Sequence, residues 1–138
     1  MINQDRQYHI FAVAILMKEK AKILHLNEQE MFTLGILHDI GYEFDQTETH
    51  NITGGNILKK QNYKYYKEVK YHGDPLTEYT SKELCLLNYC DMHINGKGKY
   101  VSFEERLEDI KLRRGENSLF YINAKKIIDK LIQSHFLE

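Results

Sequence analysis

The sequence predicts an all-α fold, a single-domain bundle of about seven helices. One proline and eight glycines in 138 residues leave long stretches without helix breakers. Most of the glycines fall between segments in which apolar residues recur every three or four positions, the period of an amphipathic helix. A chain of this length fits one domain and can bury about two thirds of its unfolded surface.

Each expected helix is supported by an apolar face or by a recognisable end. The second opens at Asn27 with Glu30 three residues on, a capping-box-like start. We expect Gly41 at the C′ position that ends this helix, and Gly73 as the stop signal of the fourth. The seven helices are expected at about 5–25, 28–40, 50–61, 64–72, 81–95, 103–114 and 119–136.

The last three helices are expected from their caps and from their apolar spacing. Thr80 with Glu83 is the expected cap of the fifth helix, and Ser102 with Glu105 is a capping box for the sixth. The sixth and seventh helices have apolar inner faces made by Phe103, Leu107, Ile110, Ala124, Ile127, Ile128 and Leu131. These helices, at about 103–136, are expected to brace those at about 5–95, and no chemistry is assigned to them.

His38 and Asp39 form an unusual polar pair near the end of the second helix. His38 follows Met31 and Leu34 at spacings of seven and four, so it shares their inward face. Asp39 lies about 100° further round the helix. A metal ion between the two side chains would explain the pair. A core histidine with one hydrogen bond, next to a surface aspartate, would explain it equally well.

Other predicted helices also place a residue of ligand type on their apolar face, and this favours a metal site over an ordinary core histidine. Four further residues of ligand type share an apolar stripe with their neighbours, namely His9, His50, His72 and Asp91. Burying so many polar groups without partners would cost several kcal/mol in total. Five predicted helices therefore each direct at least one potential metal ligand into the core.

In its order and helical context, this set resembles the HD domain superfamily of metal-dependent phosphohydrolases. The resemblance extends from Arg6 to about Asn95. It implies that a principal metal is bound by His9, His38, Asp39 and Asp91. It also implies that His50 and His72 bind a second metal, with Asp39 as the bridging, catalytic carboxylate that holds the nucleophile.

The segment 50–55, HNITGG, is similar to the branch that includes the small dinucleoside tetraphosphate hydrolases, so the expected substrate is nucleotide-like. Many two-metal relatives have a lysine shortly after the His-Asp pair, where this chain has Gly41-Tyr42-Glu43, so a basic residue must come from elsewhere. Tyr42 is a candidate substrate contact. Lys97 and Lys99 are candidate phosphate contacts, with a solvated turn bearing surface lysines as the alternative.

The expected cofactors are one or two divalent metal ions per chain, Fe, Mn, Co, Zn or Mg, because imidazole and carboxylate ligands suit such ions. The expected reaction is hydrolysis of a phosphoester or phosphoanhydride by a metal-activated water. Two alternatives remain open. The same ligand array could hold two irons in an oxygenase of the superfamily, or the chain could be a regulatory module that binds a nucleotide without turnover.

The composition of the chain limits the classes of partner and the location that we expect. The formal net charge of −1 with mixed signs argues against a nucleic-acid-binding surface. No apolar run approaches the ~18 residues of a membrane span, so a cytoplasmic protein is expected. Cys85 and Cys90 are expected as free thiols. Three further histidines, His25, His93 and His135, are expected at the surface or as caps. The oligomeric state is left open, a homodimer included.

Overall fold

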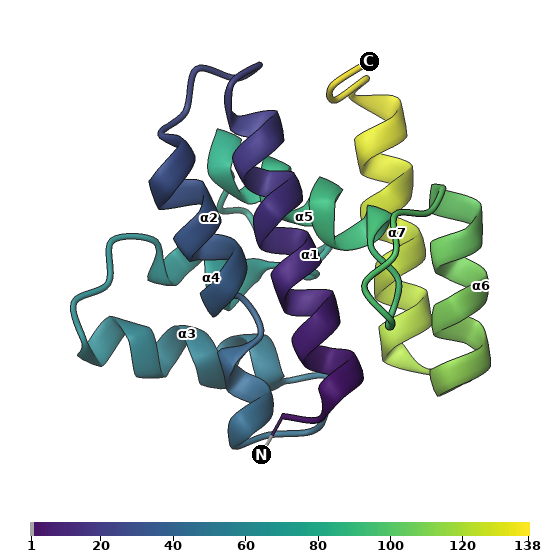
Figure 1. The fold of residues 1–138 in the computed structure, drawn as a ribbon. Helices are drawn as coiled ribbons and strands as arrows, with labels where there is room; N and C mark the ends of the chain where they lie inside the picture. Colours follow the sequence, from purple (N-terminus) through teal and green to yellow (C-terminus); the bar gives the residue numbers. More distant parts are fainter. Residues whose placement is uncertain (1) are drawn as a thin grey trace.

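The computed structural model describes residues 2–138 and is all-α over that range (Figure 1). It contains seven α-helices and one short 3-10 helix, which confirms the predicted fold class. In chain order the elements are α1 (Gln4–Ala21), α2 (Glu28–Leu37), η1 (Ile40–Glu43), α3 (His50–Lys60), α4 (Tyr66–Tyr71), α5 (Lys82–His93), α6 (Phe103–Arg114) and α7 (Leu119–Gln133).

Side-chain caps set the starts of five α-helices. In each, the oxygen of the capping side chain accepts a hydrogen bond from the backbone N–H three residues on; the caps are Asn3, Asn27, Ser81, Ser102 and Ser118. The predicted cap of α2 and the predicted capping box of α6 are confirmed. The predicted cap of α5 is wrong by one residue, because Ser81 and not Thr80 accepts from Leu84.

The chain turns out of α2 earlier than expected. The last helical residue is Leu37 and His38 is the C-cap, so Gly41 lies within η1 and the prediction of a C′ glycine is wrong. Gly41 is required for another reason. A Cβ atom on it would lie 1.8 Å from the carbonyl oxygen of His50. Only glycine therefore allows η1 to approach the start of α3 this closely.

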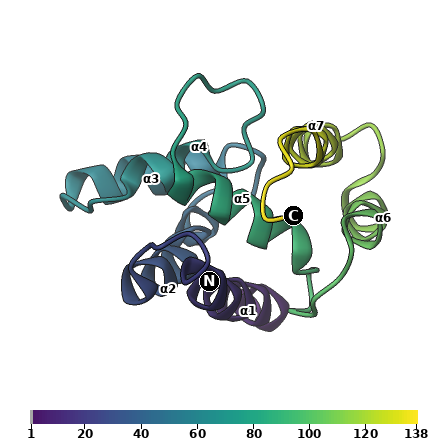
Figure 2. The same cartoon turned by 90° about the horizontal axis from the view of Figure 1, so that it is seen from above.

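Helix α5 joins two apolar clusters and is buried on most of its sides. Figures 1 and 2 show α2, α3 and α4 on one side of the molecule, α6 and α7 side by side on the other, and α1 and α5 between them. The first cluster is built by α1 to α5 and includes Met17, Leu34, Leu58, Val69 and Leu87. The second joins α5 to α6 and α7 and includes Met92, Ile110, Ala124, Ile127 and Leu131.

His93 is buried, so its expected surface position is wrong. Its ring stacks on Phe103 and Tyr100, with centroid distances of 4.1 and 5.1 Å, and its Nδ1 donates to the carbonyl of Val101 at 2.7 Å. These contacts tie the segment after α5 to the body of the fold. His25 and His135 are exposed, as predicted.

Two further expectations concern the cysteines and the membrane. Cys85 and Cys90 are free thiols, as predicted. Among the described residues, no helix has both the length and the apolar character needed to span a membrane.

Candidate metal centre and its cavity

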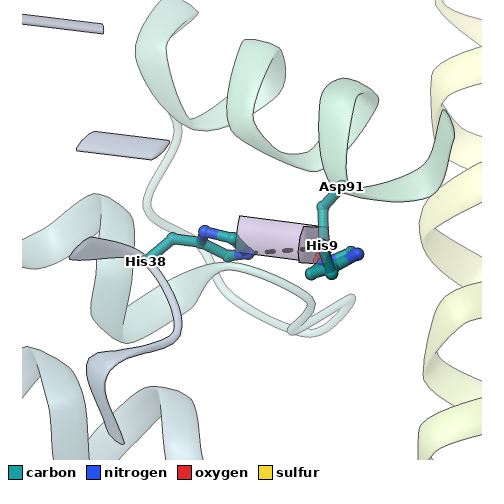
Figure 3. A group of neighbouring side chains, drawn as sticks. All are labelled: His9, His38 and Asp91. Carbon is teal, nitrogen blue, oxygen red and sulfur yellow. Dashed lines mark hydrogen bonds and ion pairs between the residues drawn. The ribbon is translucent and has the colours of Figure 1, made fainter. Parts of the chain in front are cut away.

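All six predicted ligands meet at one place. They come from different elements: His9 lies in α1, His38 caps α2, Asp39 precedes η1, His50 opens α3, His72 ends α4 and Asp91 lies in α5. Five are buried and His50 is partly buried. Figure 3 shows the side chains of His9, His38 and Asp91 converging. Two overlapping groups have ligand atoms close enough to share an ion: His9, His38, Asp91 and His38, Asp39, His72.

The two carboxylate oxygens of Asp39 face different histidines. Oδ2 lies 3.2 Å from Nε2 of His38 and 3.7 Å from Nε2 of His9. Oδ1 lies 3.2 Å from Nε2 of His50 and 3.4 Å from Nε2 of His72. Asp39 therefore stands between two pairs of imidazoles, each pair directed at its own oxygen.

Asp91 completes the first of these groups. Its Oδ1 lies 2.8 Å from Nε2 of His9 and 3.6 Å from Nε2 of His38. Two ligands that bind one ion at about 2.1 Å, with angles between 90° and 109°, are about 3.0 to 3.4 Å apart. The separations around Asp39 and Asp91 are close to this range.

The orientation of the four imidazoles is fixed by the backbone. Each Nδ1 donates to a carbonyl oxygen: His9 to Asn95 at 3.0 Å, His38 to Gly35 at 2.6 Å, His50 to Thr47 at 3.1 Å and His72 to Val69 at 2.6 Å. A carbonyl oxygen can only accept, so the Nδ1 atoms must carry the protons. Every Nε2 atom then directs a lone pair at the carboxylates, the arrangement of metal-binding histidines.

Lone pairs that face carboxylate oxygens repel them unless a proton or a cation lies between. Nε2 of His38 is buried and makes no hydrogen bond among the described residues. Burial disfavours a charged His38, but Asp39 and Asp91 outweigh it and raise its pKa to about 10. Burial likewise opposes ionisation of these two acids, yet the facing histidines hold the pKa of both carboxyls well below the ordinary value. The donor set therefore fits divalent cations.

A turn before α3 orients His50. Asp45 accepts hydrogen bonds from the backbone N–H and the hydroxyl of Thr47, at 2.9 and 2.5 Å, and from the hydroxyls of Thr49 and Thr53. The bonds from Thr47 are the main reason that the pKa of Asp45 is lowered. The carbonyl of the same Thr47 accepts from His50, so Asp45 supports this ligand through one intervening residue.

A cavity of about 470 Å³ opens on the cluster, and Asp39, His50, His72 and Asp91 lie in its wall. Tyr42 also lines it; the Tyr42 ring stacks on His50 at 3.8 Å, and the guanidinium of Arg6 covers the ring at 4.1 Å. Tyr42 therefore lies at the cavity, with its ring buried against His50 and Arg6, and its role as a substrate contact stays a prediction.

The predicted phosphate contacts Lys97 and Lys99 are not brought to this cavity. Both side chains are exposed, and neither is among the described residues that line it. Their turn is held by Asn95, whose side-chain oxygen accepts from the backbone N–H of both lysines. The arrangement matches the alternative of a solvated turn.

Two arginines contact the acids of the cluster, and neither was predicted. Nη1 of Arg6 lies 3.0 Å from Oδ2 of Asp39. Nε of Arg106 donates to the carbonyl of Asp91 at 3.0 Å, and its Nη2 lies 3.7 Å from Oδ1 of the same residue. A sequence signal existed for both: Arg6 precedes His9 by three residues and Arg106 precedes Ile110 by four, so each lies on an inward face. Arg106 belongs to the C-terminal helices, to which no chemistry was assigned from the sequence, and it lies beside the cluster.

Comparison with known proteins gives one match. The family model described as HD domain matches residues 6–131, a span that includes all six ligand-type residues. Searches of curated proteins and of solved structures found no match.

Proposed function

The chain belongs to the HD domain family, whose members are typically metal-dependent phosphohydrolases, and from this premise we propose that it hydrolyses a phosphoester or phosphoanhydride bond in a small nucleotide-like molecule. The observation that carries the proposal is the orientation of four imidazoles by backbone carbonyls, with every Nε2 directed at the carboxylates of Asp39 and Asp91. A proton or a cation must lie between these imidazoles and carboxylates, and divalent cations would satisfy both kinds of group at once.

The two proposed ligand sets each contain one carboxylate oxygen of Asp39. His9, His38 and Asp91, together with Oδ2 of Asp39, surround one position. His50 and His72, together with Oδ1 of Asp39, surround a second. Asp39 is the proposed bridge, and its role as the catalytic carboxylate is to hold the attacking water between the two positions. The ions are Fe, Mn, Co, Zn or Mg in this proposal, since the ligands are nitrogen and oxygen only.

Divalent ions, when bound here, would lower the pKa of a bound water to about 7 and would neutralise phosphoryl oxygens. The protein residues orient the reactants. Arg6 contacts Oδ2 of Asp39, and Arg106 contacts the backbone carbonyl and Oδ1 of Asp91, so the two arginines help to hold these acids in place. Both guanidinium groups line the cavity, so they also face the phosphoryl group.

The size of the cavity supports a substrate of nucleotide size. Its volume of about 470 Å³ falls within the range of roughly 300–1,000 Å³ that holds drug-sized ligands. Phe120 and Tyr42 provide aromatic surface in the wall, and Asn51 and Asn123 provide amides. A small phosphorylated molecule is the proposed partner, and the net charge of −1 agrees with the absence of a nucleic-acid role in this proposal.

Phosphate release from a panel of compounds tests the proposed function. The protein is purified anaerobically, loaded with manganese or iron, and supplied with nucleotides, dinucleoside polyphosphates and sugar phosphates. We expect at least one compound to be hydrolysed, with activity lost on addition of a chelator and restored by the metal. Oxygen consumption by the iron-loaded protein without phosphate release would contradict the proposal in favour of an oxygenase. Tight nucleotide binding with no product would contradict it in favour of a regulatory module.

A further inference from the structure

Four arginines line the cavity, and three of them come from α6. They are Arg6, Arg106, Arg113 and Arg114. Arg6 and Arg106 contact the acids of the metal cluster, as described above. Nε of Arg113 lies 2.9 Å from Oδ1 of Asp109 and its Nη2 lies 3.9 Å from Oδ2 of Asp5. The charges of these three arginines are thus already offset by carboxylates.

Arg114 differs from the other three. Among the described residues, no carboxylate lies within 4 Å of its guanidinium group. The guanidinium carbon of Arg114 lies 4.2 Å from the ring centre of Phe120. A guanidinium that stacks on a ring by its face keeps its N–H edge available for a bidentate contact with an anion.

Arg114 lines the same cavity as Tyr42 and His50, which belong to the side of the cavity at the metal cluster. Tyr42 stacks on His50, and the His50 ring lies 6.3 Å from the ring of Phe120 at an interplanar angle of 18°. The cavity wall therefore runs without interruption from Arg6 through three aromatic rings to Arg114.

Stabilisation of the helix end explains only part of this arrangement. Basic residues in the last turn of a helix interact favourably with its dipole, and α6 has Lys111, Arg113 and Arg114 there. Lys111 lies outside the cavity and pairs with Glu116 at 3.8 Å. Arg114 is exposed at the last position of α6, but the dipole alone does not explain why it lines the cavity without a carboxylate partner in the described part of the chain.

We propose that Arg114 forms an anion subsite, and that the substrate carries a second phosphate group in addition to the one that reacts at the histidine–aspartate cluster. This inference rests on the proposed function and narrows its substrate class to molecules with at least two phosphates, such as those with a polyphosphate chain. In this proposal the reacting phosphate lies at the cluster, and the polyphosphate chain of the substrate extends along the aromatic wall to Arg114.

Binding of two phosphonates to the manganese-loaded full chain tests the subsite. Methylphosphonate has one anionic group, and bis(phosphonomethyl)phosphinate is a carbon-bridged triphosphate analogue that resists hydrolysis. We expect calorimetry, at constant free manganese, to show at least about tenfold tighter binding of the longer compound. Arg114→Ala is expected to remove most of this preference and to leave the affinity for methylphosphonate within about twofold of wild type.

Two further variants separate the subsite from general charge effects. Arg114→Lys keeps the charge without the planar fork and is expected to retain part of the preference. Lys111→Ala removes a cation from the same helix end, outside the cavity, and is expected to retain all of it. An unchanged preference in Arg114→Ala, an equal loss in Lys111→Ala, or no preference in wild type would overturn the subsite.

Phosphate release, measured on the same samples, distinguishes failure of the subsite from failure of the proposed function. An Arg114-dependent preference in a protein that hydrolyses nothing supports the subsite and contradicts the hydrolase. Hydrolysis, together with a preference for the longer phosphonate that does not depend on Arg114, supports the hydrolase and contradicts the subsite.

Discussion

Asp39→Asn is expected to lower kcat by on the order of 10³-fold or more and to reduce the metal content of the protein. Both carboxylate oxygens of Asp39 face pairs of histidine Nε2 atoms, so one substitution affects both proposed metal positions. Asparagine has the same shape but no negative charge, and its amide nitrogen cannot act as a ligand in place of Oδ1 or Oδ2. The measurements are phosphate release and elemental analysis of the purified variant.

The matched control is Asp129→Asn, which makes the same change on the exposed side of α7, away from the cavity. It is expected to retain wild-type activity and metal content. Thermal denaturation of both variants shows whether each is folded. A folded Asp39→Asn protein with full activity or full metal content would refute the role of Asp39 as the bridge.

Gly41→Ala is expected to destabilise the fold by about 3 kcal/mol and to lower activity as well. The added Cβ would lie 1.8 Å from the oxygen and 2.7 Å from the carbon of the His50 carbonyl, and 3.0 Å from the backbone nitrogen of Gly54. These are backbone atoms at the start of α3, which cannot move aside as a flexible side chain can. The start of α3 must shift, and His50 shifts with it. Urea denaturation measures the loss of stability.

Gly115→Ala is the comparison for this substitution. Gly115 has φ +93°, so alanine is strained there, but no atom lies within 4 Å of the new Cβ. This variant is expected to lose stability through backbone strain alone and to keep its activity. If Gly41→Ala lost no more stability than Gly115→Ala and kept full activity, the claim that glycine is required for the close approach of η1 to α3 would be contradicted.

The helices and the six ligand-type residues could be predicted because both depend on local periodicity. The side chain of Asn27 caps α2 by accepting from the backbone N–H of Glu30, three residues later. His38 faces inward because it shares a helix face with Leu34 and Met31. Such relations are contained within one or two turns of helix. Five helices each direct a side chain of ligand type inward. Because α1 to α5 enclose a single core, these side chains must meet in it.

Features that depend on contacts between distant segments could not be predicted in this way. The place of Gly41 depends on the backbone of His50, which belongs to another helix. The burial of His93 depends on Tyr100 and Phe103, which fold back over it. Arg114 reaches the cavity only because α6 and α7 pack beside the cluster, which their own sequences do not reveal. The contribution of the C-terminal helices to the cavity wall was missed for this reason.

The central claim is that two metal positions share Asp39. Its most direct test is the number of metal ions per chain, measured by elemental analysis after anaerobic purification and loading with manganese, in wild type and in His72→Ala. Nε2 of His72 lies 3.4 Å from Oδ1 of Asp39, on the side of the proposed second position, so its loss is expected to remove a ligand from that position and to spare the position at His9 and Asp91. We predict about two ions per chain in wild type and about one in His72→Ala. One ion per chain in both proteins would contradict the claim.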